Sequence, residues 1–147
     1  RGINNDRLRY VTIKAIKDHP LVFGLDKVDI SKDIYVLEGP IDSMFVDNSI
    51  SVGGSDFKRI SNFAAKEMFT MVYDNQPRNK ELLTIMERSI DDGYKVVIWP
   101  DYIKEKDINE MILAGMSKEE VFHIINSNAY KNLAAKAKLK EWRKINA

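Results

Sequence analysis

Short apolar runs that lead into an acidic residue recur three times in this sequence, and they constrain the fold more than any other feature. Each run is too short for a helix and is rich in β-branched or aromatic side chains, which is typical of buried strands. The runs occupy residues 34–37, 68–73 and 94–99, and the acids after them are Glu38, Asp74 and Asp101.

Helical patterns separate these runs. A fourth short strand is predicted at residues 49–52, and Asn79 is a plausible N-cap for a helix over residues 80–92. Further helices are predicted from Asp107, from a capping box at Ser117, and over residues 128–145. Strands that alternate with helices of crossover length predict an α/β fold with a mainly parallel, four-stranded sheet flanked by helices. Residues 9–16 alternate in polarity and predict an extra N-terminal strand.

Composition bounds the domain organisation and the environment. A length of 147 residues with 44% hydrophobic content fits one domain with a helical appendage, and the formal net charge of +1 favours no class of partner. We divide the chain into a lead-in (1–33), a core (34–115) and basic C-terminal helices (116–147). The absence of cysteine excludes disulfides and thiolate zinc sites in this chain and fits a reducing compartment. No apolar run approaches the roughly 18 residues of a membrane span, so no membrane contact is expected.

The three acids after the strands suggest a metal site. In a parallel sheet these strand ends meet at one edge, where adjacent strands lie ~4.8 Å apart. Carboxylates there can share a divalent cation such as Mg²⁺, which keeps open positions for water and phosphate. For any one acid, capping of the next helix is the better explanation. The three together favour a metal site.

Several segments resemble a known family. The first motif is Tyr35-Val-Leu-Glu-Gly-Pro-Ile-Asp-Ser-Met-Phe45, and Val72-Tyr-Asp-Asn-Gln-Pro-Arg78 and Lys106-Asp-Ile-Asn-Glu-Met-Ile112 follow in order. Together they resemble the TOPRIM domain, the metal-binding module of primases, topoisomerases and some nucleases, and more narrowly that of T4-type phage DNA primases. The resemblance covers nearly the whole chain and implies a Rossmann-like TOPRIM sheet with a helical C-terminal tail.

The resemblance also implies roles for acidic residues. Glu38 matches the family's glutamate, which is assigned as general base for the attacking 3′-hydroxyl or as a metal ligand. Asp74 matches the first acid of an Asp-x-Asp pair that binds Mg²⁺, and Asp42 matches a supporting acid. Gln76 stands where the second acid of the pair is expected, so an amide replaces a charge in the set of metal ligands. Asp101 aligns only loosely with a third ligand.

For several other polar residues the sequence allows two explanations. Lys106 and Asp107 fit a loop that lies beside the metal in such primases, but Asp107 is an equally good helix N-cap. Arg78 follows the acidic turn and either meets triphosphate or template or is a solvated helix-start residue. The basic end, with Lys136, Lys138 and Lys140, either contacts nucleic acid or a helicase, or is a solvated helix that packs Leu133, Ala137 and Leu139 on the domain. Trp99 is expected in the core, and Trp142 is a candidate for nucleic-acid or partner contact.

The resemblance implies the catalytic part of an enzyme, a DNA primase. It would synthesise short RNA primers on single-stranded DNA from ribonucleoside triphosphates, with Mg²⁺ or Mn²⁺ and beside a hexameric replicative helicase. The expected location is the cytoplasm of the infected bacterial host. The chain is expected to be a C-terminal fragment that holds no zinc and primes weakly or not at all by itself. Two alternatives remain: a TOPRIM-type metal-dependent nuclease, and a non-catalytic helicase- or DNA-binding module.

Overall fold

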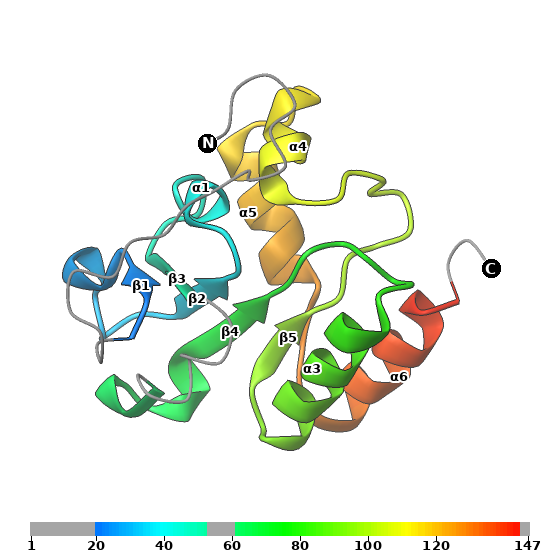
Figure 1. Ribbon diagram of the computed structural model, residues 1–147, viewed down its shortest axis with the longest axis horizontal. Coiled ribbons are helices and arrows are strands. Elements are labelled where there is room, and N and C mark those ends of the chain that lie inside the picture. The colour runs from blue at the N-terminus through cyan, green and yellow to red at the C-terminus, as the bar shows by residue number, and fades with distance from the viewer. Residues whose placement is uncertain (1–19, 53–60, 145–147) are drawn as a thin grey trace.

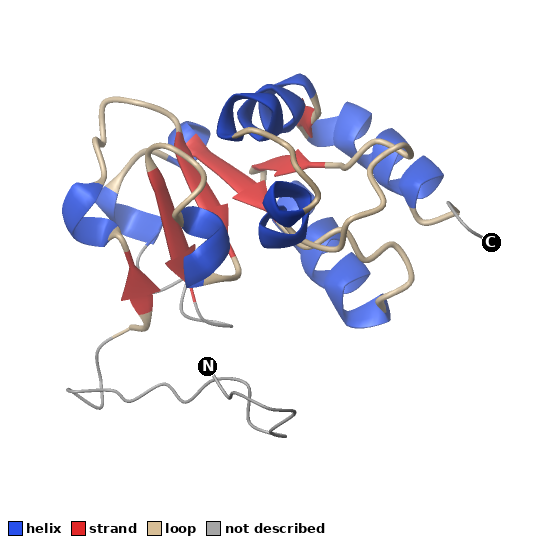
Figure 2. Cartoon of the chain, turned by 90° about the horizontal axis from the view of Figure 1, so that it is seen from above, coloured by secondary structure: helices blue, strands red, loops and turns tan. Residues whose placement is uncertain are grey.

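The computed structural model describes residues 20–52 and 61–144, in which a six-stranded sheet has helices on both sides (Figures 1 and 2). The sheet order is β1 (Val22–Phe23), β3 (Ser49–Val52), β2 (Ile34–Leu37), β4 (Phe69–Val72), β5 (Lys95–Val97) and β6 (Ala129–Tyr130). The four central strands are parallel, and the short edge strands β1 and β6 are antiparallel to their neighbours. The predicted α/β fold with four mainly parallel strands is confirmed.

The sheet core lies in β2 and β4, where every residue is buried. Ile34 and Phe69 are fully inaccessible and sit opposite each other, as do Leu37 and Val72 at the other end of the pair. Strands covered on both faces read as continuous apolar runs, and this is why the runs were visible in the sequence. The register brings the ends of β2 and β4 to the same edge of the sheet.

The helices divide between the two faces of the sheet. α3 (Lys80–Asp91) packs against α6 (Asn132–Trp142), and both contact β5. On the other face α1 (Pro40–Ser43) contacts α4 (Ile108–Leu113), which contacts α5 (Lys118–Ser127). Three short 3-10 turns complete the described part, at Leu25–Lys27, Ser61–Phe63 and Lys66–Met68.

The predicted helix starts are confirmed by their side-chain caps. The Asn79 side chain accepts hydrogen bonds from Glu81 N and Leu82 N, and Asp107 accepts one from Glu110 N. Ser117 forms the reciprocal capping box with Glu120. These caps satisfy main-chain donors that a helix cannot pair internally.

The C-terminal helix begins later than predicted. Residues 129–130 form β6 because the open edge of β5 offers main-chain partners, and α6 starts only at Asn132. Its phase also differs: Leu133 is 79% exposed and Ala137 is exposed. The buried face carries Leu139, as expected, together with Ala135 and Trp142.

Three other expectations have mixed outcomes. Trp99 is a core residue, as expected, whereas Trp142 is only 2% exposed and is not available for base stacking. The strand predicted at 9–16 lies outside the described residues. Within the described residues, no helix has the length and apolarity needed to cross a membrane.

Candidate functional site

Four carboxylates surround one small hollow at the edge where β2 and β4 end. Glu38 follows β2, Asp42 lies in α1, Asp74 follows β4, and Asp107 caps α4. Apolar and aromatic side chains form the remaining walls: Leu37, Val72, Tyr73, Trp99 and Ile108. The site is therefore a hollow lined by both acidic and hydrophobic side chains, and we call it the acidic edge.

Glu38 and Asp74 meet because of the strand register. Leu37 lies opposite Val72, so the residues that follow them leave neighbouring strands at the same level. Asp74 N donates to Glu38 Oε1 over 3.4 Å. Glu38 is at the surface, but the surrounding protein desolvates its carboxyl group, and this burial followed by the charge of Asp74 raises its pKa above the usual value. A carboxylate with a raised pKa is a stronger proton acceptor than an ordinary glutamate.

Asp42 ties α1 to α4. Its Oδ1 accepts a hydrogen bond of 2.8 Å from Asn109 N, in the first turn of α4. Burial, followed by repulsion from Asp107 and Asp74, raises the pKa of the Asp42 carboxyl. The close approach of this carboxylate also explains Gly39, because a Cβ at that position would collide with Asp42 Oδ2. Asp42 thus supports the acidic edge and places the start of α4 beside it.

Lys106 supplies a positive charge to the acidic edge. Its Nζ lies 3.3 Å from Asp74 Oδ2 and 3.9 Å from Asp107 Oδ2. Burial lowers the pKa of the Lys106 amine, but attraction to Asp74, Asp107 and Glu110 outweighs it, and the net shift is upward. Asp107 caps α4 through Glu110 N at 2.8 Å, which confirms its predicted role as a helix N-cap, and it also lines the hollow.

Gln76 faces Asp74 with its nitrogen. Gln76 Nε2 donates to Asp74 Oδ2 over 3.0 Å, while its Oε1 accepts from Asn79 Nδ2 over 3.1 Å. Coordination of a cation by the Gln76 oxygen would require the amide to turn over and break both bonds. In this conformation Gln76 holds the carboxylate of Asp74 in place.

Asp101 is not brought into the acidic edge. β5 ends at Val97, and the chain continues through Trp99 and Pro100 before it reaches Asp101. Asp101 is exposed and lines a neighbouring hollow, where Lys104 Nζ donates to its main-chain oxygen. Asp101 therefore does not line the hollow with Glu38 and Asp74, as its predicted role as a metal ligand would require.

Asn75 is a structural residue of the site that the sequence reasoning missed. Its Nδ2 donates to the main-chain oxygens of Ile103 and Glu105, both at 3.0 Å, and its N donates to Lys106 O. Its Oδ1 accepts from Trp142 Nε1 over 3.2 Å. One side chain thus fixes the Lys106 loop and joins it to α6. The only sequence signal was an asparagine inside the Asp-Asn-Gln-Pro turn.

The donor set fits Mg²⁺ held by a small number of protein ligands. In the described part of the chain, no three or more His, Cys, Asp or Glu side chains are arranged to hold a metal ion. Mg²⁺ does not require such a cage, since it is commonly bound through one or two carboxylates plus waters and substrate phosphates. Glu38 and Asp74 provide two adjacent carboxylates, and Asp74 already pairs with a cation, the Lys106 ammonium.

The predicted nucleic-acid residues lie in two places. Arg78 is exposed just before α3, with no ion-pair partner among the described residues. Lys136 and Lys140 line a groove between α3 and α6, to which Arg143 and Lys144 also contribute. Lys138 is absent from the lining and pairs instead with Glu141 at 3.0 Å on α6 itself. Arg143 and Lys144 belong to the same basic end but were not singled out as contacts, because the sequence does not show which of its charges line the groove.

Comparison with known proteins shows that the chain is similar in sequence to a DNA primase. It is 33% identical over 139 residues to the DNA primase of Enterobacteria phage T4, a match that covers 93% of this chain and 40% of that protein. The chain therefore spans less than half of the relative's length. No family model matches the sequence. The chain is related to part of a DNA primase, as the sequence motifs predicted.

Proposed function

We propose that this chain is the TOPRIM-type, metal-binding catalytic part of a DNA primase, which synthesises short RNA primers on single-stranded DNA. The observation that carries the proposal is the meeting of Glu38 and Asp74 at the ends of neighbouring parallel strands. In parallel α/β sheets this is the edge where ligands bind. The relation to the T4 primase supports the choice of reaction.

The chain's own residues would perform four tasks. Asp74 and Glu38 would hold Mg²⁺ or Mn²⁺, which when bound neutralises negative charge on the phosphates. Glu38 has a second possible role, since its raised pKa suits a base that accepts the proton of the attacking 3′-hydroxyl. Arg78, exposed beyond the Asp74 turn, would meet the triphosphate. Gln76 and Asn75 would hold Asp74 and the Lys106 loop in position.

The partners follow from the same proposal. The substrates would be ribonucleoside triphosphates and a single-stranded DNA template, and the macromolecular partner would be a replicative hexameric helicase. The setting would be the cytoplasm of a phage-infected bacterium. With 40% of the relative's length covered, we expect weak or no priming by this chain alone.

Metal binding tests the proposal most directly. Mn²⁺ affinity can be measured by electron paramagnetic resonance for the wild type, Glu38→Gln and Asp74→Asn. Each substitution should weaken binding roughly tenfold or more, equivalent to about 1.4 kcal/mol, because one carboxylate charge is lost. Asp101→Asn is the matched control and should remain within about twofold. Equal Mn²⁺ affinity in all four proteins would contradict the proposed site.

A nuclease would use the same acids with water as the nucleophile. Incubation of supercoiled DNA with the protein and Mn²⁺ distinguishes the two activities. The primase proposal predicts no nicking. Nicking that disappears in Glu38→Ala would assign the site to a nuclease instead.

A non-catalytic module is the second candidate, and Gln76 is the observation that favours it. An amide nitrogen, not a second carboxylate, faces Asp74. Gln76→Asp restores the family's acid and should strengthen Mn²⁺ binding about tenfold if the site is a metal site. Undetectable Mn²⁺ binding in both proteins, together with tight helicase binding, would support the non-catalytic module.

A further inference from the structure

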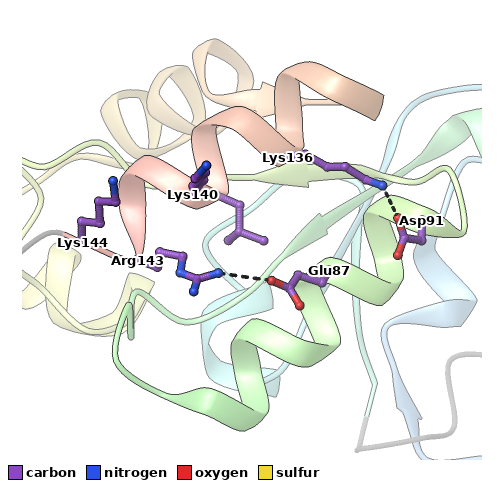
Figure 3. Close-up of a pocket in the computed structure, with 7 residues that line it drawn as sticks. Glu87, Asp91, Lys136, Lys140, Arg143 and Lys144 are labelled. Atoms are coloured by element: carbon purple, nitrogen blue, oxygen red, sulfur yellow. Dashed lines mark ion pairs between the residues drawn. The ribbon is translucent and has the colours of Figure 1, made fainter.

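The groove between α3 and α6 is a second charged site, separate from the acidic edge (Figure 3). Its cavity volume is about 360 Å³. Four basic side chains, two acidic ones and one leucine line it: Lys136, Lys140, Arg143, Lys144, Glu87, Asp91 and Leu139. The charges within the groove therefore sum to an excess of two positive charges.

The two acids are already paired. Lys136 Nζ lies 2.6 Å from Asp91 Oδ1, and Arg143 Nη1 lies 3.6 Å from Glu87 Oε1. Lys140 and Lys144 have no ion-pair partner in the described part of the chain. Figure 3 shows both extending to the same side of α6, away from the two ion pairs. The excess positive charge is therefore concentrated on this pair of lysines.

The spacing of these lysines suits a repeating polyanion. Lys140 lies near the end of α6, and Lys144 lies in the turn after Trp142, where its main-chain N donates to Glu141 O over 3.0 Å. The two lysines are therefore about one helical turn apart, roughly 5 Å along the helix axis. Nucleic acid carries a phosphate charge about every 3.4 Å along each strand of a duplex, so two lysines at this spacing can reach nearby phosphates of one strand. Lysine binds phosphate as a flexible point charge and does not require a fixed geometry.

We propose that the α3–α6 groove binds the phosphate backbone of a single-stranded nucleic acid, with Lys140 and Lys144 as the main contacts. The described residues that line the groove include no aromatic side chain for base stacking, and Trp142 is buried. Binding should therefore be independent of sequence and strongly dependent on salt. The choice of a single strand over a duplex rests on the proposed primase function.

The groove is connected to the acidic edge through one helix. α6 and the turn that follows it carry the groove's basic residues at exposed positions, while the buried Trp142 of α6 donates to Asn75, the residue after Asp74. Leu139, 3% exposed, anchors the same helix in the core. A strand held in the groove would thus be attached to the element that fixes the catalytic loops.

The test measures binding of a fluorescently labelled oligothymidylate by anisotropy at several salt concentrations. The variant Lys140→Gln/Lys144→Gln is compared with Lys27→Gln/Lys32→Gln, which removes the same charge from exposed lysines outside the groove. Loss of two phosphate contacts should weaken binding several-fold and make the slope of log K against log salt shallower by about 1.4. The control pair should change neither quantity appreciably.

Three results would overturn the proposal. One is unchanged affinity and slope in the groove variant, and another is an equal loss in the control pair. The third is a groove variant that keeps its oligonucleotide affinity but loses affinity for polyglutamate, which would identify an acidic peptide as the ligand. Mn²⁺ affinity of Lys140→Gln/Lys144→Gln is measured beside its oligonucleotide affinity, so failure of the metal site and failure of the groove are distinguishable.

Discussion

The acidic edge and the α3–α6 groove both gather charged side chains, but they compensate the charge differently. At the acidic edge four carboxylates share one hollow, and Lys106 pairs with two of them, Asp74 and Asp107. In the groove, by contrast, each acid has its own basic partner, and the paired side chains are 51–60% exposed. Repulsion between carboxylates therefore persists at the acidic edge, whereas in the groove ion pairing and exposure to water reduce the repulsion between like charges.

This difference indicates what holds each site together. Crowded, partly desolvated carboxylates disfavour folding, as the raised pKa values of Glu38 and Asp42 show, and only buried strands and main-chain hydrogen bonds can keep them close. Exposed ion pairs contribute little to stability and need no such support. We therefore expect substitutions around the acidic edge to change stability much more than substitutions in the groove.

The largest effect is expected from Asn75→Ala. The substitution removes the side-chain bonds to Ile103 O, Glu105 O and Trp142 Nε1 and leaves those groups without their partner. The expected loss is about 2–4 kcal/mol of unfolding free energy, from urea denaturation, at about 1 kcal/mol for each bond. Asn62→Ala, at an exposed position, is the control and should stay within about 0.5 kcal/mol. Equal costs for the two variants would break the comparison.

Asn75→Asp separates positioning from stability. Aspartate keeps an oxygen for Trp142 Nε1 but cannot donate to the two carbonyl oxygens that hold the Lys106 loop. If Asn75 positions the loop, this variant should weaken Mn²⁺ binding even at temperatures where it is fully folded. Wild-type Mn²⁺ affinity in the folded variant would reduce Asn75 to a purely structural residue.

A smaller effect is expected from Gly39→Ala. The added Cβ would displace the Asp42 carboxylate and break its bond to Asn109 N, so α4 loses a cap worth about 1 kcal/mol. A double-mutant cycle tests this cause. In an Asp42→Ala background the collision is absent, and Gly39→Ala should then cost clearly less. The same cost in both backgrounds would show that the backbone, and not Asp42, requires glycine.

The sequence predicted those parts of the site that follow from local pattern. Glu38 and Asp74 were located because buried parallel strands are visible as apolar runs whose ends meet. The caps at Asn79, Asp107 and Ser117 were visible because the capping residue and the helix it starts are adjacent in sequence.

The remaining parts depend on contacts between distant segments. Asp101 follows an apolar run that extends beyond the strand, and the sequence does not show that β5 stops at Val97. The phase of α6 is set by packing on α3, so exposure of Leu133 and burial of Trp142 could not be read from its pattern. Asn75 owes its role to partners 28 and 67 residues away.

Glu38→Gln should stabilise the protein at neutral pH. The native state raises the pKa of Glu38 above its ordinary 4.5, so it binds this proton more tightly than the unfolded chain does. The contribution of Glu38 to the free energy of unfolding is therefore fully present below the pKa of the unfolded state and is lost as the pH rises through the pKa of the native state. The variant should melt above the wild type at pH 7, and the difference should vanish below about pH 4. A difference independent of pH would mean that charge repulsion at the acidic edge is not its cause.

The smallest effect is expected in the groove, from Arg143→Gln. The ion pair to Glu87 is 3.6 Å long, and its side chains are 51% and 54% exposed, so its loss should cost about 0–0.5 kcal/mol. Urea denaturation at low and at high salt checks this, since screening should remove even that difference. Lys106→Gln is the matched substitution at the acidic edge and should cost more, because Asp74 and Asp107 lose a shared cation. Suppose that Arg143→Gln lowers the free energy of unfolding more than Lys106→Gln does. The ion pairs of the groove would then hold α6 against α3, and these charges would not be available to bind a ligand.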